Sequence, residues 1–268
     1  MTVNIAGHDF TILWDGVYCF ALSDYPHISP WELKKLLAFM AYEKLHGRQT
    51  EITCENTEIM GAVHHAIAHP ETVAHATMPE KITECTACKQ KGCLTKFVCH
   101  TASVENAAKI FSCGKLLSAL KASGKPASEL VSCPRNAAGD PADFFDYIMF
   151  SWGNCQAGDR LVMERKLGRS PNEHELQERF TPGVRFFFRY DDIAACPGYV
   201  FDGYHPAKIK DELRLSDCLY ACVIPEQYRL ALAHLVPEAL AARVHFVAQD
   251  GLGIWDWSEK VYAFVEGC

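Results

Sequence analysis

Four cysteines lie close together near the middle of the chain: Cys85, Cys88, Cys93 and Cys99. Zinc takes four thiolate or imidazole ligands in a tetrahedron, and short loops between cysteines bring the thiolates together. So dense a cluster is unusual for thiols that only pack in a core. We therefore predict a closed, structural metal site with zinc bound. An iron–sulfur cluster is the alternative, because it uses the same ligands. If Cys99 instead packs in the core, Cys54 or a histidine would complete the site.

A second set of chemically useful residues follows the cysteines. His100-Thr101 ends a predicted strand, and the helix after it ends near Gly114. Arg135 then precedes an aromatic stretch at residues 143–153 (DFFDYIMFSWG), and residues 210–215 (KDELRL) place a glutamate at the start of a strand. A carboxylate can act on a glycosidic bond, while an arginine and flat aromatic rings can hold a nucleotide.

The order of these motifs resembles that of the ADP-ribosyltransferases, and in particular the DarT-type mono-ADP-ribosyltransferases. The resemblance covers roughly residues 96–225 and rests on three short motifs. It implies that NAD is the substrate, that His100 holds the adenosine ribose and that the backbone at Thr101 faces the nicotinamide amide. It also implies that Arg135 and three aromatic residues line the NAD pocket, namely Tyr147, Phe150 and Trp152.

Glu212 is the catalytic carboxylate that the resemblance implies, and the chemistry suits a carboxylate. Cleavage of the glycosidic bond of NAD creates an oxocarbenium-like centre, and a carboxylate beside the ribose 2′-hydroxyl stabilises its positive charge. Glu212 can also orient or deprotonate the acceptor, and Arg135 can pair bidentately with a pyrophosphate or an acceptor group. The plainer interpretation makes Glu212 an exposed ion-pair partner of Lys210 and Arg214, and makes the aromatic residues core residues.

These residues are compatible with several functions. The first is transfer of ADP-ribose to a nucleic-acid base, a protein side chain or a small molecule, and the DarT resemblance favours a nucleic acid. The second keeps the same fold and hydrolyses NAD. The third is a zinc-stapled binding or adaptor module without catalysis. Cysteine-based hydrolysis, for example by Cys155, has no supporting motif and is not expected.

The elements that must position the catalytic residues are expected from residue 96 onward. Strands are predicted at residues 96–101, 144–152, 184–190, 213–215, 218–224 and 244–248. Helices are predicted at residues 102–111, 225–234, 237–242 and 254–265, with a short helix beginning near residue 170. Residues 121–142 are expected to be a loop, because Ser, Gly, Pro and Ala dominate them. The fold class is therefore α+β, and the resemblance implies split antiparallel sheets with flanking helices.

Residues 1–80 are expected to form a small α/β unit of their own. Strands are predicted at residues 10–14 and 17–21, around an Asp15–Gly16 turn, and at residues 49–54. Residues 29–32 (SPWE) have the form of a capping box that opens a helix ending at Gly47, and Asn56 opens a second helix. The expected organisation is this unit, a cysteine-rich metal-binding segment at residues 81–99, and a catalytic domain at residues 96–268.

Charge is distributed unevenly between these parts. Residues 1–80 hold 4 basic and 10 acidic residues, whereas residues 81–268 hold 22 basic and 23 acidic residues. The acidic N-terminal unit suits a protein partner. The remainder lacks the basic excess of a typical nucleic-acid-binding domain. It offers only one local basic cluster, at Arg160, Arg165, Lys166 and Arg169.

The thirteen cysteines give information on the cellular compartment of the protein. Their odd number and clustered spacing favour reduced thiols and a metal site over a disulfide framework. No apolar run is long enough for a membrane span, and the N-terminal residues do not have the pattern of a signal peptide. We expect a cytoplasmic protein that does not enter a membrane.

Overall fold

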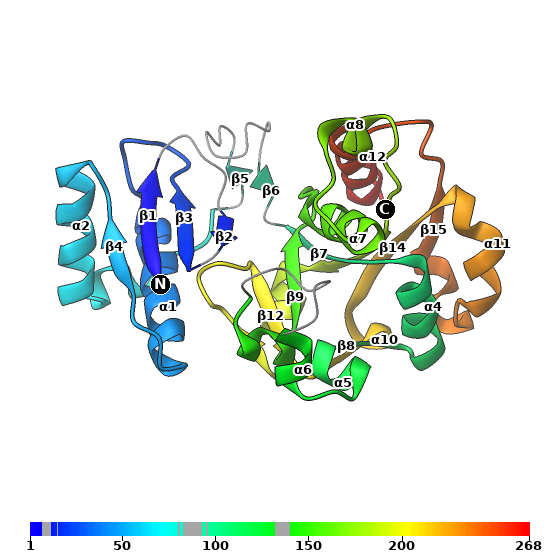
Figure 1. Cartoon of the computed structure of the whole chain (residues 1–268), viewed down its shortest axis with the longest axis horizontal. Coiled ribbons are helices and arrows are strands. Elements are labelled where there is room, and N and C mark those ends of the chain that lie inside the picture. Colours follow the sequence, from blue (N-terminus) through cyan, green and yellow to red (C-terminus); the bar gives the residue numbers. More distant parts are fainter. Residues whose placement is uncertain (7–11, 15, 80, 83–92, 95, 132–139) are drawn as a thin grey trace. The chain divides into compact units, whose positions relative to one another are not determined.

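The structure is a computed structural model of the 268-residue chain (Figure 1), and it describes residues 1–6, 12–14, 16–79, 81–82, 93–94, 96–131 and 140–268. The chain divides into two compact units. Unit 1 contains Met1–Thr95 and Phe201–Pro206, and unit 2 contains Lys96–Val200 and Ala207–Cys268. Unit 1 thus extends beyond residue 80 and includes a short segment from far along the chain.

Unit 1 is built on a four-stranded sheet with the order β2-β3-β1-β4. β1 (Thr2–Ala6) runs parallel to both β3 (Val17–Ala21) and β4 (Glu51–Thr53). β2 (Ile12–Trp14) is antiparallel to β3, as expected for two strands joined by a tight turn. The three strands predicted from the sequence are confirmed, and β1 is an addition to them.

The two long helices of unit 1 begin where the sequence predicts. α1 (Pro30–Leu45) has a complete capping box: the Glu32 N–H donates to the Ser29 hydroxyl, and the Ser29 N–H donates to the Glu32 carboxylate at 2.8 Å. α2 (Thr57–Ala68) is capped by the Asn56 side chain, which accepts hydrogen bonds from two backbone N–H groups. Strands and helices enclose a shared hydrophobic core that contains Val3, Ile5, Tyr18, Phe20, Leu22, Leu36, Phe39, Ile59 and Val63.

A small ribbon follows the helices of unit 1. After α3 (Glu71–Ala74), β5 (Lys81–Ile82) pairs with β6 (Cys93–Leu94) in antiparallel orientation. The segment between the two strands, residues 83–92, lies outside the described residues. The predicted metal-binding segment is therefore described only at its two ends.

Unit 2 is built on a seven-stranded mixed sheet with the order β11-β12-β9-β7-β10-β14-β15. All neighbouring strands are antiparallel except β14 and β15, which are parallel. The strands are β7 (Phe97–Ala102), β9 (Tyr147–Trp152), β10 (Val184–Arg189), β11 (Tyr199–Val200), β12 (Ala207–Lys210), β14 (Leu219–Pro225) and β15 (Val244–Val247). A separate antiparallel ribbon joins β8 (Lys115–Leu117) to β13 (Glu212–Arg214). The α+β class is confirmed, with one large mixed sheet and flanking helices.

Helices connect most of these strands. They are α4 (Val104–Cys113), α5 (Ala119–Ser123), α6 (Ala127–Val131), η1 (Ala142–Asp146), α7 (Ala157–Leu167), α8 (Glu173–Gln177), α9 (Tyr190–Ala194), α10 (Leu215–Cys218), η2 (Glu226–Tyr228), α11 (Arg229–Leu232), η3 (Ala233–Leu235), η4 (Glu238–Arg243) and α12 (Ile254–Glu266). α4 ends as predicted at Gly114, whose φ of 68° is the left-handed conformation that favours glycine at a helix end. The prediction of a loop at residues 121–142 is wrong in part, because the end of α5, all of α6 and the first residue of η1 lie there.

Different helices cover the two faces of the large sheet. On β10, Arg185 points to one face, where it bonds to Asp159 of α7 and Ser258 of α12. The next residue, Phe186, points to the other face and packs on Phe111 of α4, with 5.6 Å between ring centroids. This alternation follows from the two-residue period of a strand.

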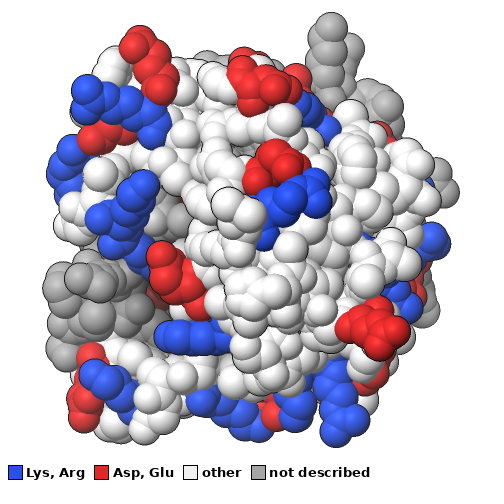
Figure 2. Space-filling view, turned by 90° about the vertical axis from the view of Figure 1, so that its right-hand side faces the viewer, with Lys and Arg blue, Asp and Glu red and all other residues white. Residues whose placement is uncertain are grey.

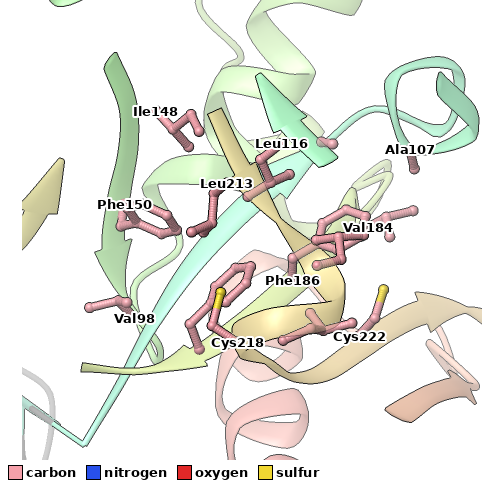
Figure 3. Packing of buried hydrophobic residues seen from close by; sticks show 14 of the residues in the cluster. Val98, Ala107, Leu116, Ile148, Phe150, Val184, Phe186, Leu213, Cys218 and Cys222 are labelled. Carbon is pink, nitrogen blue, oxygen red and sulfur yellow. The ribbon is translucent and has the colours of Figure 1, made fainter. Parts of the chain in front are cut away.

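The main core of unit 2 lies on the face that carries Phe186 (Figure 3). Figure 3 shows Leu116 and Leu213 of the β8–β13 ribbon beside Ile148 and Phe150 of the large sheet. The ribbon therefore covers part of this face and buries the apolar side of β13. Glu212 and Arg214, which flank Leu213, consequently point away from the core.

Candidate functional site

Three strand ends that carry predicted site residues lie at one end of the large sheet. β9 is antiparallel to β7, with Val98 opposite Trp152. β12 is antiparallel to β9, with Lys210 opposite Tyr147. The end of β7, the start of β9 and the end of β12 therefore coincide. His100-Thr101, Tyr147 and Glu212 come to this end, whereas Trp152 lies at the opposite end of β9.

Pairing between β7 and β9 stops before either strand reaches this end. The register contains Val98 with Trp152 and Cys99 with Ser151, while β7 continues to Ala102 and β9 begins at Tyr147. The two strands are thus side by side at one end and unpaired at the other. His100 and Thr101 lie in the unpaired part, where backbone groups are not committed to a ladder between these two strands.

His100 is half-buried on the core face of β7, and its tautomer follows from its contacts. The Nδ1 atom lies 3.2 Å from the carbonyl oxygen of Met149, so Nδ1–H donates this hydrogen bond. The Phe150 ring packs edge-on against the imidazole at 6.2 Å. Burial lowers the pKa of His100, and the nearby Arg165 lowers it further. The ring is therefore held neutral, with Nε2 as a hydrogen-bond acceptor.

The Thr101 side chain points to the opposite face, towards α7. A Cβ on Gly158 would lie 2.3 Å from Thr101 Oγ1, and a Cβ on Gly183 would lie 2.6 Å from Thr101 Cγ2. These glycines allow α7 and the segment before β10 to pack directly on Thr101. The side chain is a packing element, and only its backbone can take the role that the family resemblance implies.

The three predicted aromatic residues occupy different environments. Phe150 is 1% exposed and packs against Phe188, so it supports His100 from within the core. Trp152 shares the Phe150 face but lies at the other strand end, 5.7 Å from the Tyr190 ring. Tyr147 is half-buried at the start of β9 and alternates to the other face, where the Lys208 ammonium lies 5.3 Å from its ring. The structure therefore does not gather these rings around one pocket.

Glu212 lies at the start of β13 with two lysine partners. Lys115 Nζ donates to Oε1 at 2.8 Å, and Lys121 Nζ lies 3.5 Å from Oε2. The hydrogen bond from Lys115 lowers the pKa of Glu212, and the charges of Lys115 and Lys121 act in the same direction. The carboxylate is therefore ionised, and Oε2 is the oxygen with the weaker contact.

The backbone around Glu212 is fixed by hydrogen bonds on both sides. Asp211 adopts a φ of 68°, which is uncommon for a residue other than glycine. Its N–H donates to the Asp146 carbonyl at 2.9 Å, and its carbonyl accepts from the Ser118 N–H at 2.8 Å. This kink ends β12 and redirects the chain into β13, so that Glu212 lies beside the residues that precede β9.

Sequence reasoning did not assign a role to Lys115 or Lys121. Lys115 follows the turn that ends α4, but nothing in the sequence spacing marks Glu212 as its partner. The pairing of β8 with β13 joins residues far apart in the chain. A charged pair created by such long-range pairing leaves no local signal in one sequence.

Arg135 lies outside the described residues, as do Cys85 and Cys88, and the side chain of Cys93 is likewise not described. Cys99 is 2% exposed within β7, and burial raises the pKa of its thiol to about 12. Its burial within β7 fits the alternative in which Cys99 packs in the core. Among the described residues, no group of three or more His, Cys, Asp or Glu side chains could hold a metal ion.

A surface hollow of about 380 Å³ occurs in unit 1. It is lined by Ser29, Pro30, Trp31, His75, Ala76, Thr77 and Pro79. The hollow is open to solvent, and its lining carries no cluster of reactive groups.

The predicted basic cluster is partly neutralised by carboxylates. Arg160 lies 3.8 Å from Glu164, and Arg169 forms a two-pronged bond with Glu175. Figure 2 shows one face of the molecule, on which basic and acidic residues are interspersed around a broad uncharged area. On the coloured part of this face, the basic residues do not form a continuous tract.

No helix in the described part of the chain combines the length and the hydropathy that a membrane crossing requires. No protein-family model, curated protein or solved structure matches the chain. The assignment of a function therefore rests on the motifs and on the geometry at the sheet end.

Proposed function

We propose that this protein cleaves NAD and transfers its ADP-ribose, with Glu212 as the catalytic carboxylate. The observation that carries the proposal is the end of the large sheet in unit 2. There the β7–β9 pairing stops, His100 lies in the unpaired part of β7, and Glu212 follows the end of β12. These are the residues that the resemblance to ADP-ribosyltransferases places in the NAD site.

The state of His100 supports a role in ribose binding. Its Nδ1–H is occupied by the Met149 carbonyl, which leaves Nε2 as an acceptor for a sugar hydroxyl. The lowered pKa keeps the ring neutral at physiological pH, so this acceptor is not lost to protonation. The edge contact with Phe150 fixes the ring plane.

The state of Glu212 supports a role in charge stabilisation. The lysine partners keep the carboxylate ionised, and the contact of Oε2 with Lys121 is longer than an ordinary hydrogen bond. A ribose hydroxyl can therefore displace that contact. As the bond between nicotinamide and C1′ breaks, its electron pair leaves with nicotinamide, and the carboxylate stabilises the oxocarbenium-like ribose. The acceptor then bonds to C1′ and loses its proton, which Glu212 can receive.

A closed four-cysteine site would leave a bound metal no open position, so the proposed reaction assigns the metal no step. The acceptor is a separate question. The resemblance favours a nucleic-acid base, and the interspersed charges in Figure 2 favour a small, local contact over a long basic groove. We therefore test NAD cleavage first and use a nucleic acid as the first acceptor.

The test compares wild type with Glu212→Gln in NAD titration calorimetry, followed by mass analysis of released nicotinamide. Both proteins are expected to bind NAD, because the substitution is isosteric and His100 is unchanged. Only wild type is expected to release nicotinamide at a substantial rate, and loss of the carboxylate should lower the rate by about 100-fold or more. Single-stranded DNA added to the wild-type reaction should gain the mass of ADP-ribose.

Glu226→Gln is the matched control. Glu226 is also a partly exposed glutamate with a short ion pair, to Arg229 at 2.6 Å, but it lies on η2. This variant is expected to retain wild-type turnover. Equal loss in both variants would contradict a specific role for Glu212. A folded wild-type protein that neither binds NAD nor releases nicotinamide would refute the proposed function.

A further inference from the structure

The arginines of α7 and of the turn after it differ in how far carboxylates neutralise them. Arg160 lies 3.8 Å from Glu164, and Arg169 donates to Glu175 at 2.8 and 2.6 Å. Arg165 is exposed, and among the described residues no carboxylate lies within ion-pair distance of it. Its guanidinium is therefore the one of these three that can bind an anion without giving up an ion pair.

Helical spacing fixes the side of α7 on which Arg165 lies. Gly158, Val162 and Arg165 are spaced at i, i+4 and i+7, so they share one face of the helix. Gly158 packs on β7, because a Cβ at this position would lie 2.3 Å from Thr101 Oγ1. The face that carries Arg165 is therefore the face that α7 turns towards the end of β7.

The course of α7 takes Arg165 past the last pair of residues in the β7–β10 ladder. Val162 Cγ2 would lie 3.2 Å from a Cβ on Gly183, and the next residue, Val184, pairs with Ala102 at the end of β7. Arg165 is almost one turn further along the helix, a rise of about 4.5 Å. Its side chain therefore lies at the sheet end at which the β7–β9 pairing stops.

The electrostatic environment of His100 agrees with this position. Burial lowers the pKa of His100 most, and the positive charge of Arg165 lowers it as well. The Nδ1–H of His100 donates to the Met149 carbonyl, so the neutral ring offers Nε2 as an acceptor. A free guanidinium and a neutral hydrogen-bond acceptor are thus neighbours at this end of the sheet.

The chemistry of the dinucleotide brings a phosphate close to both groups. In the proposed function, His100 holds the adenosine ribose. That ribose carries the diphosphate on its 5′-oxygen and, in NADP, a further phosphate on its 2′-oxygen, so either phosphate lies within one sugar's length of a hydroxyl bound to His100. A guanidinium donates two parallel N–H bonds to phosphate oxygens, and in dinucleotide-binding folds an arginine near this ribose accommodates a 2′-phosphate.

We propose that Arg165 binds a phosphate group on the adenosine side of the dinucleotide, beside the ribose that His100 holds. This proposal rests on the proposed function for the identity of the ligand. It gives one member of the basic cluster a small-molecule phosphate to bind, instead of a tract of nucleic acid. It assigns Arg165 to binding and leaves bond cleavage to Glu212.

The test compares wild type, Arg165→Gln and Arg160→Gln, all as the full chain, in calorimetric titrations with NAD and with NADP and in nicotinamide release. Arg165→Gln should raise the dissociation constant of the dinucleotide about 10-fold or more, because a charge-assisted contact is lost. KM should rise by the same factor with kcat unchanged, since the phosphate does not react. A loss for NAD would identify the 5′-diphosphate, and a loss for NADP alone would identify the 2′-phosphate.

Arg160→Gln is the matched control. It removes the same charge from the same helix, but Arg160 lies two residues after Gly158 and so on the opposite side of α7. It should keep the wild-type affinity for both dinucleotides. Circular dichroism checks that both variants are folded, as expected for exposed positions.

The outcomes separate this inference from the proposed function. Wild-type affinity of folded Arg165→Gln for NAD and NADP would overturn the inference and leave the function intact. Equal losses in Arg165→Gln and Arg160→Gln would also overturn it, because the effect would then come from the general charge of α7. If wild type binds NAD without releasing nicotinamide, and Arg165→Gln binds it more weakly, the phosphate contact stands and the proposed function is refuted. A wild-type protein that binds neither dinucleotide would refute both.

Discussion

At the scale of single residues, the charge on Glu212 depends on its lysine partners. Lys115 is one-third exposed and Glu212 is 37% exposed, so solvent screens the pair but does not abolish it. Hydrogen bonding from Lys115 keeps the pKa of Glu212 below the ordinary value of 4.5. A function that needs the ionised carboxylate therefore survives acidification until the pH falls through this lowered pKa.

Lys115→Met tests this dependence. Loss of the hydrogen bond and of the positive charge should raise the pKa of Glu212, so the acid limb of the pH–rate profile should move to higher pH. Turnover near neutral pH should change little, because Glu212 stays ionised there. The measurement is nicotinamide release across the acidic range, with Lys260→Met as control, since Lys260 pairs with Asp250 instead. An acid limb that does not move would show that Glu212 is not the titrating group.

At the residue scale, the sequence offers only local motifs. His100 and Glu212 were selected from short motifs; His100 lies in β7 of the large sheet, and Glu212 opens β13 of the separate ribbon, just after the end of β12. The aromatic residues could not be resolved in this way. Tyr147, Phe150 and Trp152 share one stretch of sequence, but strand alternation and register place them on two faces and at two ends.

At the scale of elements, a buried ion pair joins two helices to the large sheet. Arg185 of β10 and Asp159 of α7 are both fully buried, and the guanidinium donates to Asp159 at 2.7 Å through Nε. Arg185 also donates to Ser258 of α12, and Asp159 accepts from the Gly183 N–H at 2.7 Å. One guanidinium thus holds α7 and α12 against the same strand.

Arg185→Met is expected to destabilise the protein strongly. It leaves the Asp159 carboxylate buried without its cation, which typically costs about 3–5 kcal/mol. Urea denaturation followed by circular dichroism measures the change. The double variant Arg185→Met, Asp159→Leu should recover part of the loss, because no buried charge remains. Arg229→Met, at an exposed pair, is the control and should have little effect. Equal stability of Arg185→Met and wild type would contradict this account.

The elements show where sequence patterns suffice. β10 was predicted because the sequence VRFFFR is a short apolar and aromatic run. The structure buries this strand on both faces. α12 was predicted as a closing helix, and its apolar side is buried. α7 was not predicted, because only Asp159 and Met163 are buried in it and its amphipathic signal is weak. Short helices such as α6 also escape pattern recognition, since tertiary packing rather than propensity stabilises them.

At the scale of the whole molecule, the chain forms two units whose boundary does not follow the sequence. The Asp202–Gly203 turn was recognised as a turn, and the φ of 73° at Gly203 confirms it. Its membership of unit 1 could not be foreseen, because that depends on contacts with Tyr18 and α1 that are nearly two hundred residues distant. Separate cores in the two units suggest that each unfolds as its own cooperative element.

Phe20→Ala and Phe186→Ala test this division. Phe20 is buried in unit 1 with its ring 5.5 Å from that of Tyr18, and Phe186 is buried in the core of unit 2. Each truncation should cost about 3–5 kcal/mol in its own core. We expect Phe20→Ala to accelerate hydrogen exchange in residues 16–79 and 201–206, with β10 and β14 unchanged. Phe186→Ala should do the reverse.

Residues 201–206 give the sharpest reading in this experiment, because they belong to unit 1 while β11 and β12, which flank them in sequence, belong to unit 2. If the amides of residues 201–206 respond to Phe20→Ala, this connection shares the stability of unit 1. If they respond only to Phe186→Ala, the connection belongs energetically to the β11–β12 hairpin. Simultaneous acceleration in both units by either variant would show instead that the protein unfolds as one cooperative structure.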